Sequence, residues 1–119
     1  MLKPRDTEGT EKTMDERAFE ALAGATLDRL AERLEEALAD DADVELRGGI
    51  LTVELEAGGQ FVVNRHAPTR EIWLSSPVSG ASHYARRGEA WISTRGSERL
   101  EDVLAADLER AVGRRPGLG

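Results

Sequence analysis

Residues 44–63, which read VELRGGILTVELEAGGQFVV, decide the fold because their apolar and polar side chains alternate with a period of two. Leu51, Val53 and Leu55 share one side, and the residues between them are polar. The glycine pairs at 48–49 and 58–59 can supply the positive φ that tight hairpin turns require. The stretch therefore predicts an antiparallel meander with one apolar face.

The meander continues toward the C-terminus. Pro68 ends the third strand, and a fourth strand spans 70–75 until Pro77 ends it. Shorter strands are expected near 82–86 and 90–94, around a turn at Gly88. On the fourth strand, Ile72 and Leu74 belong with the apolar face, and Trp73 points the opposite way.

Helical periodicity flanks the strands on both sides. An apolar stripe over 14–39 predicts a long amphipathic helix, with Thr13 as N-cap of a capping box closed by Glu16. A second helix is expected after Gly96, with Ser97 as N-cap, ending at Gly113. The order helix, meander, helix predicts an α+β fold. It would be a two-layer sandwich, with both helices on one face of an antiparallel sheet of five to six strands.

The length of 119 residues predicts one domain, over 14–113. Residues 1–13 are polar and acidic, which predicts a flexible tail and fits neither a secretory signal nor a mitochondrial presequence. Residues 114–119 are expected to form a C-terminal tail. The absence of cysteine excludes disulfides, thiolate metal sites and cysteine nucleophiles. No apolar run is long enough to cross a bilayer, so no membrane partner is expected.

Charge is distributed unevenly around a net value of −7. Residues 15–45 contain eleven acids and three arginines, whereas residues 65–99 contain six arginines and three glutamates. Such an acidic chain is a poor candidate for nucleic-acid binding. It also lacks a nucleophile elbow, a P-loop, a dinucleotide fingerprint and a zinc-protease motif, so we expect no enzyme.

Carboxylates follow one another at helical spacing and continue into the first strand. We call this row the acidic ridge; it comprises Asp28, Glu32, Glu35, Glu36, Asp40, Asp41, Asp43 and Glu45. Arg29 and Arg33 are expected to offset it by reaching Glu32 and Glu36 at i+3. The row fits a solvated helix face and a surface for cations or a basic partner equally well. Carboxylates on an exposed helix form no closed cage, so any metal binding is expected to be weak and salt-sensitive.

Trp73 presents a similar choice. Alternation places it with Thr52, Glu54 and Asn64 on the sheet face that the helices leave uncovered. A large aromatic residue among polar ones is a candidate partner contact. A neighbouring loop that folds over the ring would make it purely structural, and alternation alone leaves both interpretations open.

Four segments resemble the frataxin family in order and spacing, over residues 15–112. They are NRHAPTREIWLSSPVSG (64–80), HYARRGEAWI (83–92), DVELRGGILTVEL (43–55) and LEDVLAADLERA (100–111). The resemblance implies the same two-layer sandwich. It also implies an iron-binding protein of iron–sulfur cluster assembly that docks on a cysteine desulfurase and its scaffold protein, adjusts sulfur transfer and donates iron.

Carried over by position, the acidic ridge would bind iron and a basic desulfurase surface. Asn64 and Trp73 would face the scaffold protein, with His66 and Glu71 beside them. Family members commonly have glutamine in place of His66 and Glu71 and an acid in place of Ala85. These departures bear on the details of the scaffold contact and not on the fold.

Two other functions stay open at this point. One is a ferroxidase or iron-storage protein that oxidises Fe(II) at the ridge, and the other is an acidic protein-binding domain with incidental iron binding. The resemblance favours a cytoplasmic bacterial protein. We expect a monomer, with iron-dependent oligomers as the alternative.

Overall fold

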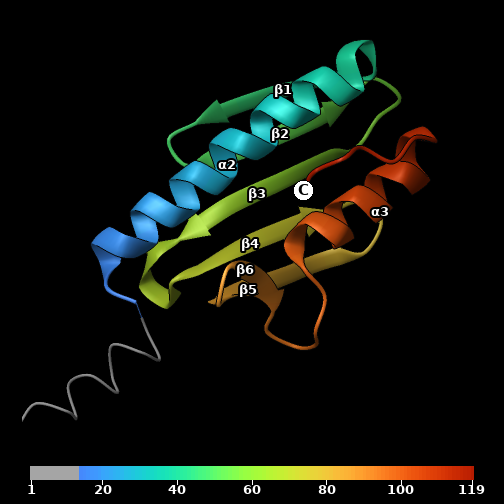
Figure 1. Ribbon diagram of the computed structural model, residues 1–119. Helices are drawn as coiled ribbons and strands as arrows, with labels where there is room; N and C mark the ends of the chain where they lie inside the picture. Colours follow the sequence, from blue (N-terminus) through green and yellow to red (C-terminus); the bar gives the residue numbers. More distant parts are fainter. Residues whose placement is uncertain (1–13) are drawn as a thin grey trace, which may run out of the picture.

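The computed structural model describes residues 14–119, which form two layers: one antiparallel sheet and two helices on one of its faces (Figure 1). The flexible tail predicted over 1–13 lies outside the described residues. The two α-helices are α2 (Glu16–Leu38) and α3 (Leu100–Val112). The strands are β1 (Ala42–Arg47), β2 (Ile50–Leu55), β3 (Gln60–His66), β4 (Glu71–Ser76), β5 (Gly80–Arg87) and β6 (Ala90–Ser93). Short 3₁₀ turns follow α2 and β3: η1 (Ala39–Asp41) and η2 (Ala67–Thr69).

The six strands lie in chain order from β1 to β6, and every neighbouring pair is antiparallel. Gly48 and Gly49 make the β1–β2 turn with φ of +59° and +80°, as the glycine pair predicts. α2 lies over the first strands of the sheet and α3 over the later ones (Figure 1). The α+β two-layer sandwich expected from the alternation is therefore confirmed.

Both helices begin later than the sequence indicates. The N-cap of α2 is Asp15, whose Oδ1 accepts a hydrogen bond from the Ala18 backbone N–H at 2.8 Å. Ser97 does not cap α3, because residues 94–97 form a turn that brings Glu98 and Arg99 back against the end of β6, and Arg99 is the N-cap. The Ser93 N–H donates to the Glu98 carbonyl at 2.8 Å, and Arg99 forms an isolated bridge with Ile92. Pairing with the end of β6 thus delays the helix, and the Ser97 prediction is wrong.

The core lies between the helices and the apolar sheet face. The inward apolar side chains of β2, β3 and β4 are at most 6% exposed, and they include Ile72 and Leu74. Trp91 of β6 closes this core: its ring packs edge-on against Phe19 at 6.0 Å, and its Nε1–H donates to Thr26 Oγ1 at 2.9 Å. The hydrogen bond satisfies the one polar atom of a ring that is 1% exposed.

Polar contacts fix two chain segments to the helices. Ser76 and Ser79, on either side of the β4–β5 turn, donate their hydroxyls to Asp107 Oδ2 of α3 at 2.7 and 2.5 Å. Residues 114–119 pack against the helices and do not extend from them (Figure 1). Leu118 is 3% exposed, and Arg33 Nη1 donates to the Gly117 carbonyl at 3.3 Å.

Tyr84 is the only tyrosine in the chain and is 1% exposed. Burial raises the pKa of its phenol above 10.0; Asp107 and Glu98 raise it further, and a hydrogen bond with Ser82 partly opposes the rise. The fold therefore favours the protonated phenol. Its stabilising effect is complete below pH 10.0 and is lost as the pH rises toward the folded-state pKa.

We predict that the phenolate absorbance of Tyr84 appears only together with alkaline unfolding. The measurement is a titration above pH 10.0 that follows phenolate absorbance and circular dichroism on the same sample. Tyr84→Phe should lose less stability than the parent chain over this range. A phenol that ionises at its ordinary pKa while the fold is intact would contradict the burial of Tyr84.

Candidate interaction and metal-binding surfaces

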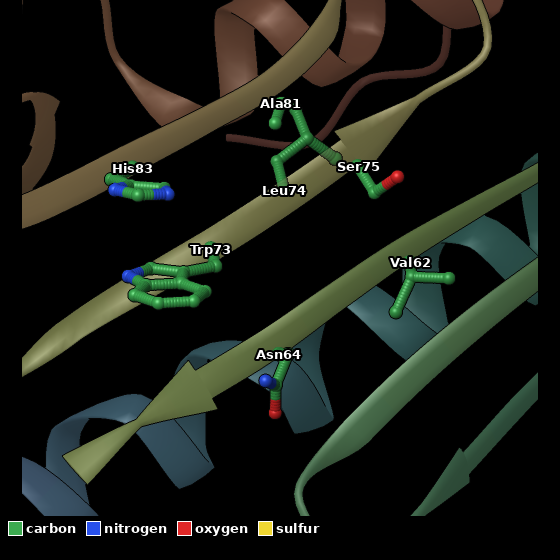
Figure 2. A pocket seen from close by; sticks show the side chains of 7 residues that line it. All are labelled: Val62, Asn64, Trp73, Leu74, Ser75, Ala81 and His83. Atoms are coloured by element: carbon green, nitrogen blue, oxygen red, sulfur yellow. The ribbon is translucent and has the colours of Figure 1, made fainter. Parts of the chain in front are cut away.

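Trp73 lies in the middle of the sheet, on the face that the helices leave uncovered, which we call the open face (Figure 2). Ile72 and Leu74 are 0% and 1% exposed beneath it, whereas Trp73 itself is partly exposed. Register places Asn64 of β3 opposite Trp73 on one side and His83 of β5 opposite it on the other. The face assignment made from alternation is thus confirmed, and within residues 14–119 the ring stays partly exposed.

Two imidazoles cover the two sides of the indole. His66 stacks on Trp73 with ring centroids 3.8 Å apart and an angle of 14° between the planes. His83 stacks from β5 at 4.2 Å and 8°. We call His66, Trp73 and His83 the three-ring stack. Stacking restricts the indole to one orientation while its outer edge remains accessible.

Glu71 connects the polar edges of the stack. Its Oε1 accepts hydrogen bonds from Trp73 Nε1–H at 2.9 Å and from the Thr69 hydroxyl at 3.2 Å. The Thr69 hydroxyl also lies 2.8 Å from His66 Nδ1, and Glu71 Oε1 lies 3.7 Å from His83 Nδ1. The predicted partner-binding residues Asn64, His66, Glu71 and Trp73 are therefore neighbours, and one carboxylate orients the stack.

A shallow, mainly apolar hollow of about 190 Å³ lies beside the stack (Figure 2). Trp73 and His83 border it together with Val62, Ser75 and Ala81. Its size and lining suit an apolar side chain of a partner.

His83 is not among the residues that the sequence analysis assigned to partner binding, and its place in the stack was missed. The signal that would have revealed it is the length of the β4–β5 turn. Ser76 pairs with Gly80 across that turn, so counting back along both strands brings Trp73 opposite His83.

The acidic ridge follows the outer side of α2, continues through η1 and ends on the edge strand β1. Its members are exposed except Asp41, which is partly buried. Asp43 and Glu45 alternate onto the open face, where they lie opposite Glu54 and Thr52 of β2. The ridge therefore reaches from the helix layer onto the edge of the open face.

The predicted pairing of Arg29 and Arg33 with Glu32 and Glu36 is wrong. Arg29 Nη2 instead contacts Glu101 Oε2 of α3 at 2.6 Å, and Arg33 donates to the Gly117 carbonyl. Positions 29 and 33 lie one residue, about 100° around the helix, from Asp28 and Glu32, and this rotation turns them toward α3. The fold thus withdraws both cations from the ridge.

Few cations remain near the ridge. Within residues 14–119, two ridge carboxylates form ion pairs: Asp41 with Arg114 at 2.7 Å and Glu45 with Arg47 at 2.5 Å. In the same range, no three His, Cys, Asp or Glu side chains converge into a group that could hold a metal ion. The ridge is therefore a dispersed anionic surface in which each carboxylate can act on its own.

The two tryptophans provide a matched pair for testing these positions. Trp91→Ala should cost about 3–5 kcal/mol of unfolding free energy, because it empties a buried site and removes the N–H that donates to Thr26. Trp73→Ala should cost only about 1–2 kcal/mol, because it removes a partly exposed stack and one hydrogen bond. Urea unfolding of both variants measures the difference. Equal losses would mean that Trp73 is a core residue.

The fold is a small α+β sandwich in which two helices cover one face of the sheet. It has two candidate interaction surfaces: the aromatic stack on the other face and the carboxylates along the edge. No helix within the described range 14–119 has the length and apolar character to span a membrane. Residues 12–114 match the model of the frataxin-like domain, and the chain belongs to the frataxin family.

Several proteins of this family are similar to the chain in sequence. The iron-sulfur cluster assembly protein CyaY of Cupriavidus pinatubonensis is 38% identical over 96 residues, which cover 78% of this chain and 86% of that protein. The mitochondrial frataxin homolog of Saccharomyces cerevisiae is 37% identical over 90 residues, which cover 72% of this chain and 52% of the yeast protein. The chain thus spans about half the length of that yeast relative.

Solved structures agree with the fold. The frataxin of Psychromonas ingrahamii superposes with a TM-score of 0.81 at 25% identity, covering 89% of this chain and 99% of that one. A trimeric frataxin from Saccharomyces cerevisiae, described as complexed with ferrous, superposes with a TM-score of 0.71 at 36% identity. That match covers 78% of this chain and 87% of the yeast chain.

Proposed function

We propose that this protein is an iron-binding regulator and adaptor of iron–sulfur cluster assembly. In this proposal it docks on the complex of a cysteine desulfurase and its scaffold protein, adjusts the rate of sulfur transfer and donates iron as cargo. Membership of the frataxin family supports the proposal, as does the name of the CyaY relatives, iron-sulfur cluster assembly protein. Because those relatives come from Cupriavidus species, we propose that the protein acts in the bacterial cytoplasm.

The observation that carries the proposal is the withdrawal of Arg29 and Arg33 from the acidic ridge. Carboxylate oxygens are suitable ligands for iron. A row in which, among residues 14–119, only Asp41 and Glu45 have ion-pair partners attracts positive charge over several ångströms. The same field suits a basic patch on the desulfurase, because complementary charge steers association. Both interactions weaken with added salt.

The open face supplies the second contact. Asn64 and the three-ring stack present an oriented aromatic edge beside an apolar hollow, which suits the scaffold protein. Because the ridge ends at β1 and the stack lies on β3–β5, two partners can bind at the same time. An adaptor needs this separation.

We propose no catalytic residue. The ridge carboxylates are spread along an exposed edge. In di-iron oxidases, by contrast, Glu-x-x-His motifs point inward and bind the metals together. The ridge thus differs from a di-iron oxidase site, and for this reason a ferroxidase is only the alternative function. A second alternative is an acidic protein-binding domain with incidental iron binding.

A ridge with fewer carboxylates should bind its partner more weakly. The triple variant Asp28→Asn, Glu32→Gln, Glu36→Gln is expected to bind the desulfurase–scaffold complex about fivefold to a hundredfold more weakly at low salt, since each rim charge contributes a few tenths to 1 kcal/mol. It should also lose its effect on desulfurase turnover. The matched control is Asp102→Asn with Glu109→Gln, which removes exposed acids from α3. Equal binding by the triple variant and the control would refute the ridge as a docking surface.

Iron binding and iron oxidation can be separated on one pair of proteins. Anaerobic Fe(II) should broaden the amide signals of residues 28–45, and much less so after Asp40, Asp41 and Asp43 are changed to Asn. In air, the parent chain and this variant should consume oxygen at the same rate if the protein is no ferroxidase. Faster consumption by the parent chain would favour the enzymatic alternative, and uniform broadening would favour the domain indifferent to iron.

A further inference from the structure

The three-ring stack places two titratable rings in parallel contact with one indole. His66 and His83 lie 3.8 and 4.2 Å from Trp73, centroid to centroid, on opposite sides of it. Imidazole is the side chain whose ordinary titration falls between pH 5 and 8. A protonated imidazole over an indole face also gains a cation–π attraction that the neutral ring lacks. The charge of the stack is therefore coupled to how firmly the indole is held.

The charged groups around the two imidazoles are few. Glu71 of β4 approaches both, directly at His83 (3.7 Å) and through the Thr69 hydroxyl at His66. Arg95, after β6, borders a second hollow of about 350 Å³ that it shares with His83. Asn64 of β3 is neutral. Glu71 places negative charge beside both rings, and Arg95 places positive charge at the hollow that it shares with His83. With one carboxylate for two imidazoles, the group changes from net negative to net positive when both rings are protonated.

The surroundings indicate which partner would respond. Of the six arginines in residues 65–99, Arg87 and Arg95 are the two available to the open face. The other four are engaged elsewhere: Arg65 with Glu20, Arg70 with the Met14 and Ala67 carbonyls, Arg86 over the Trp91 ring, and Arg99 with Glu101 and Asp102. Arg87 lies on the open face two positions beyond Ala85 of β5, and Arg95 lies beyond the opposite edge of the hollow. An acidic segment with one apolar side chain complements this surface: the apolar group fits the hollow of about 190 Å³ and the acids face His83 and Arg95.

We propose that His66 and His83 are positioning and specificity-determining residues for the open face, and that this face binds an acidic segment of its partner more tightly as the two imidazoles become protonated. The proposal rests on the docking role proposed for Trp73. It adds His83 as a contact, assigns the sign of charge to the partner segment, and makes docking dependent on pH.

A partner-free measurement tests the coupling. The indole N–H signals of Trp73 and Trp91 are followed by NMR between pH 5 and 8 in the full chain. The Trp73 signal should shift with a sigmoidal pH dependence, and it should stay constant in the double variant His66→Gln, His83→Gln. Trp91 is buried and bonded to Thr26, so its signal serves as the internal control and shows that both proteins are folded. A Trp73 signal that titrates equally in the double variant, or does not move in the parent chain, overturns the coupling.

A binding measurement tests the consequence. Affinity for the desulfurase–scaffold complex is compared at about pH 6 and about pH 8 for the parent chain and the double variant. When the pH is lowered from the higher to the lower value, the affinity of the parent chain should increase about three- to tenfold more than the affinity of the double variant does. Identical pH dependence in the two proteins overturns the inference. Absence of binding by both proteins at both pH values overturns the docking role itself, and the Trp73 titration then still decides whether the rings are coupled.

Discussion

The packing of both helices on one face of the sheet determines where every other feature of this protein lies. α2, α3 and residues 114–119 bury the inward side chains of β2, β3 and β4, and they leave the opposite face to solvent. The two tryptophans show the effect most clearly. Trp91 points inward and satisfies its one polar atom with Thr26, whereas Trp73 points outward and keeps its ring edge accessible. An exposed aromatic residue is tolerated here because neighbouring rings, and not a covering layer, hold it in place.

The same packing creates the charge separation of the molecule. α3 supplies Glu101, which binds Arg29 of α2, and the C-terminal segment supplies the Gly117 carbonyl, which binds Arg33. The outer flank of α2 is left with carboxylates that lack nearby cations. The acidic edge and the open face with its aromatic stack thus lie on different parts of one small domain, so each can present a different surface to a partner.

The sequence was sufficient for the layers, the strand order, the core face and the position of Trp73, because alternation and glycine-pair turns are local signals that tertiary packing reinforced. It failed where a contact outside the local pattern competes for a residue. Ser97 is a good N-cap, yet the turn over 94–97 and the pairing of Arg99 with Ile92 place the cap at Arg99. Arg29 has an acid at i+3, yet Glu101 of α3 binds it. The role of His83 depends on the β4–β5 register, which the turn length contains but residue type does not reveal.

The proposed adaptor function requires that one folded domain presents two separate surfaces to the assembly complex. Amide hydrogen exchange of the protein, free and bound to the desulfurase–scaffold complex, tests it most directly. Protection is expected in two regions, residues 28–45 along α2, η1 and β1 and residues 62–85 around the three-ring stack, with α3 unchanged. Protection confined to α3 and residues 114–119, with both of those regions unaffected, would contradict the account.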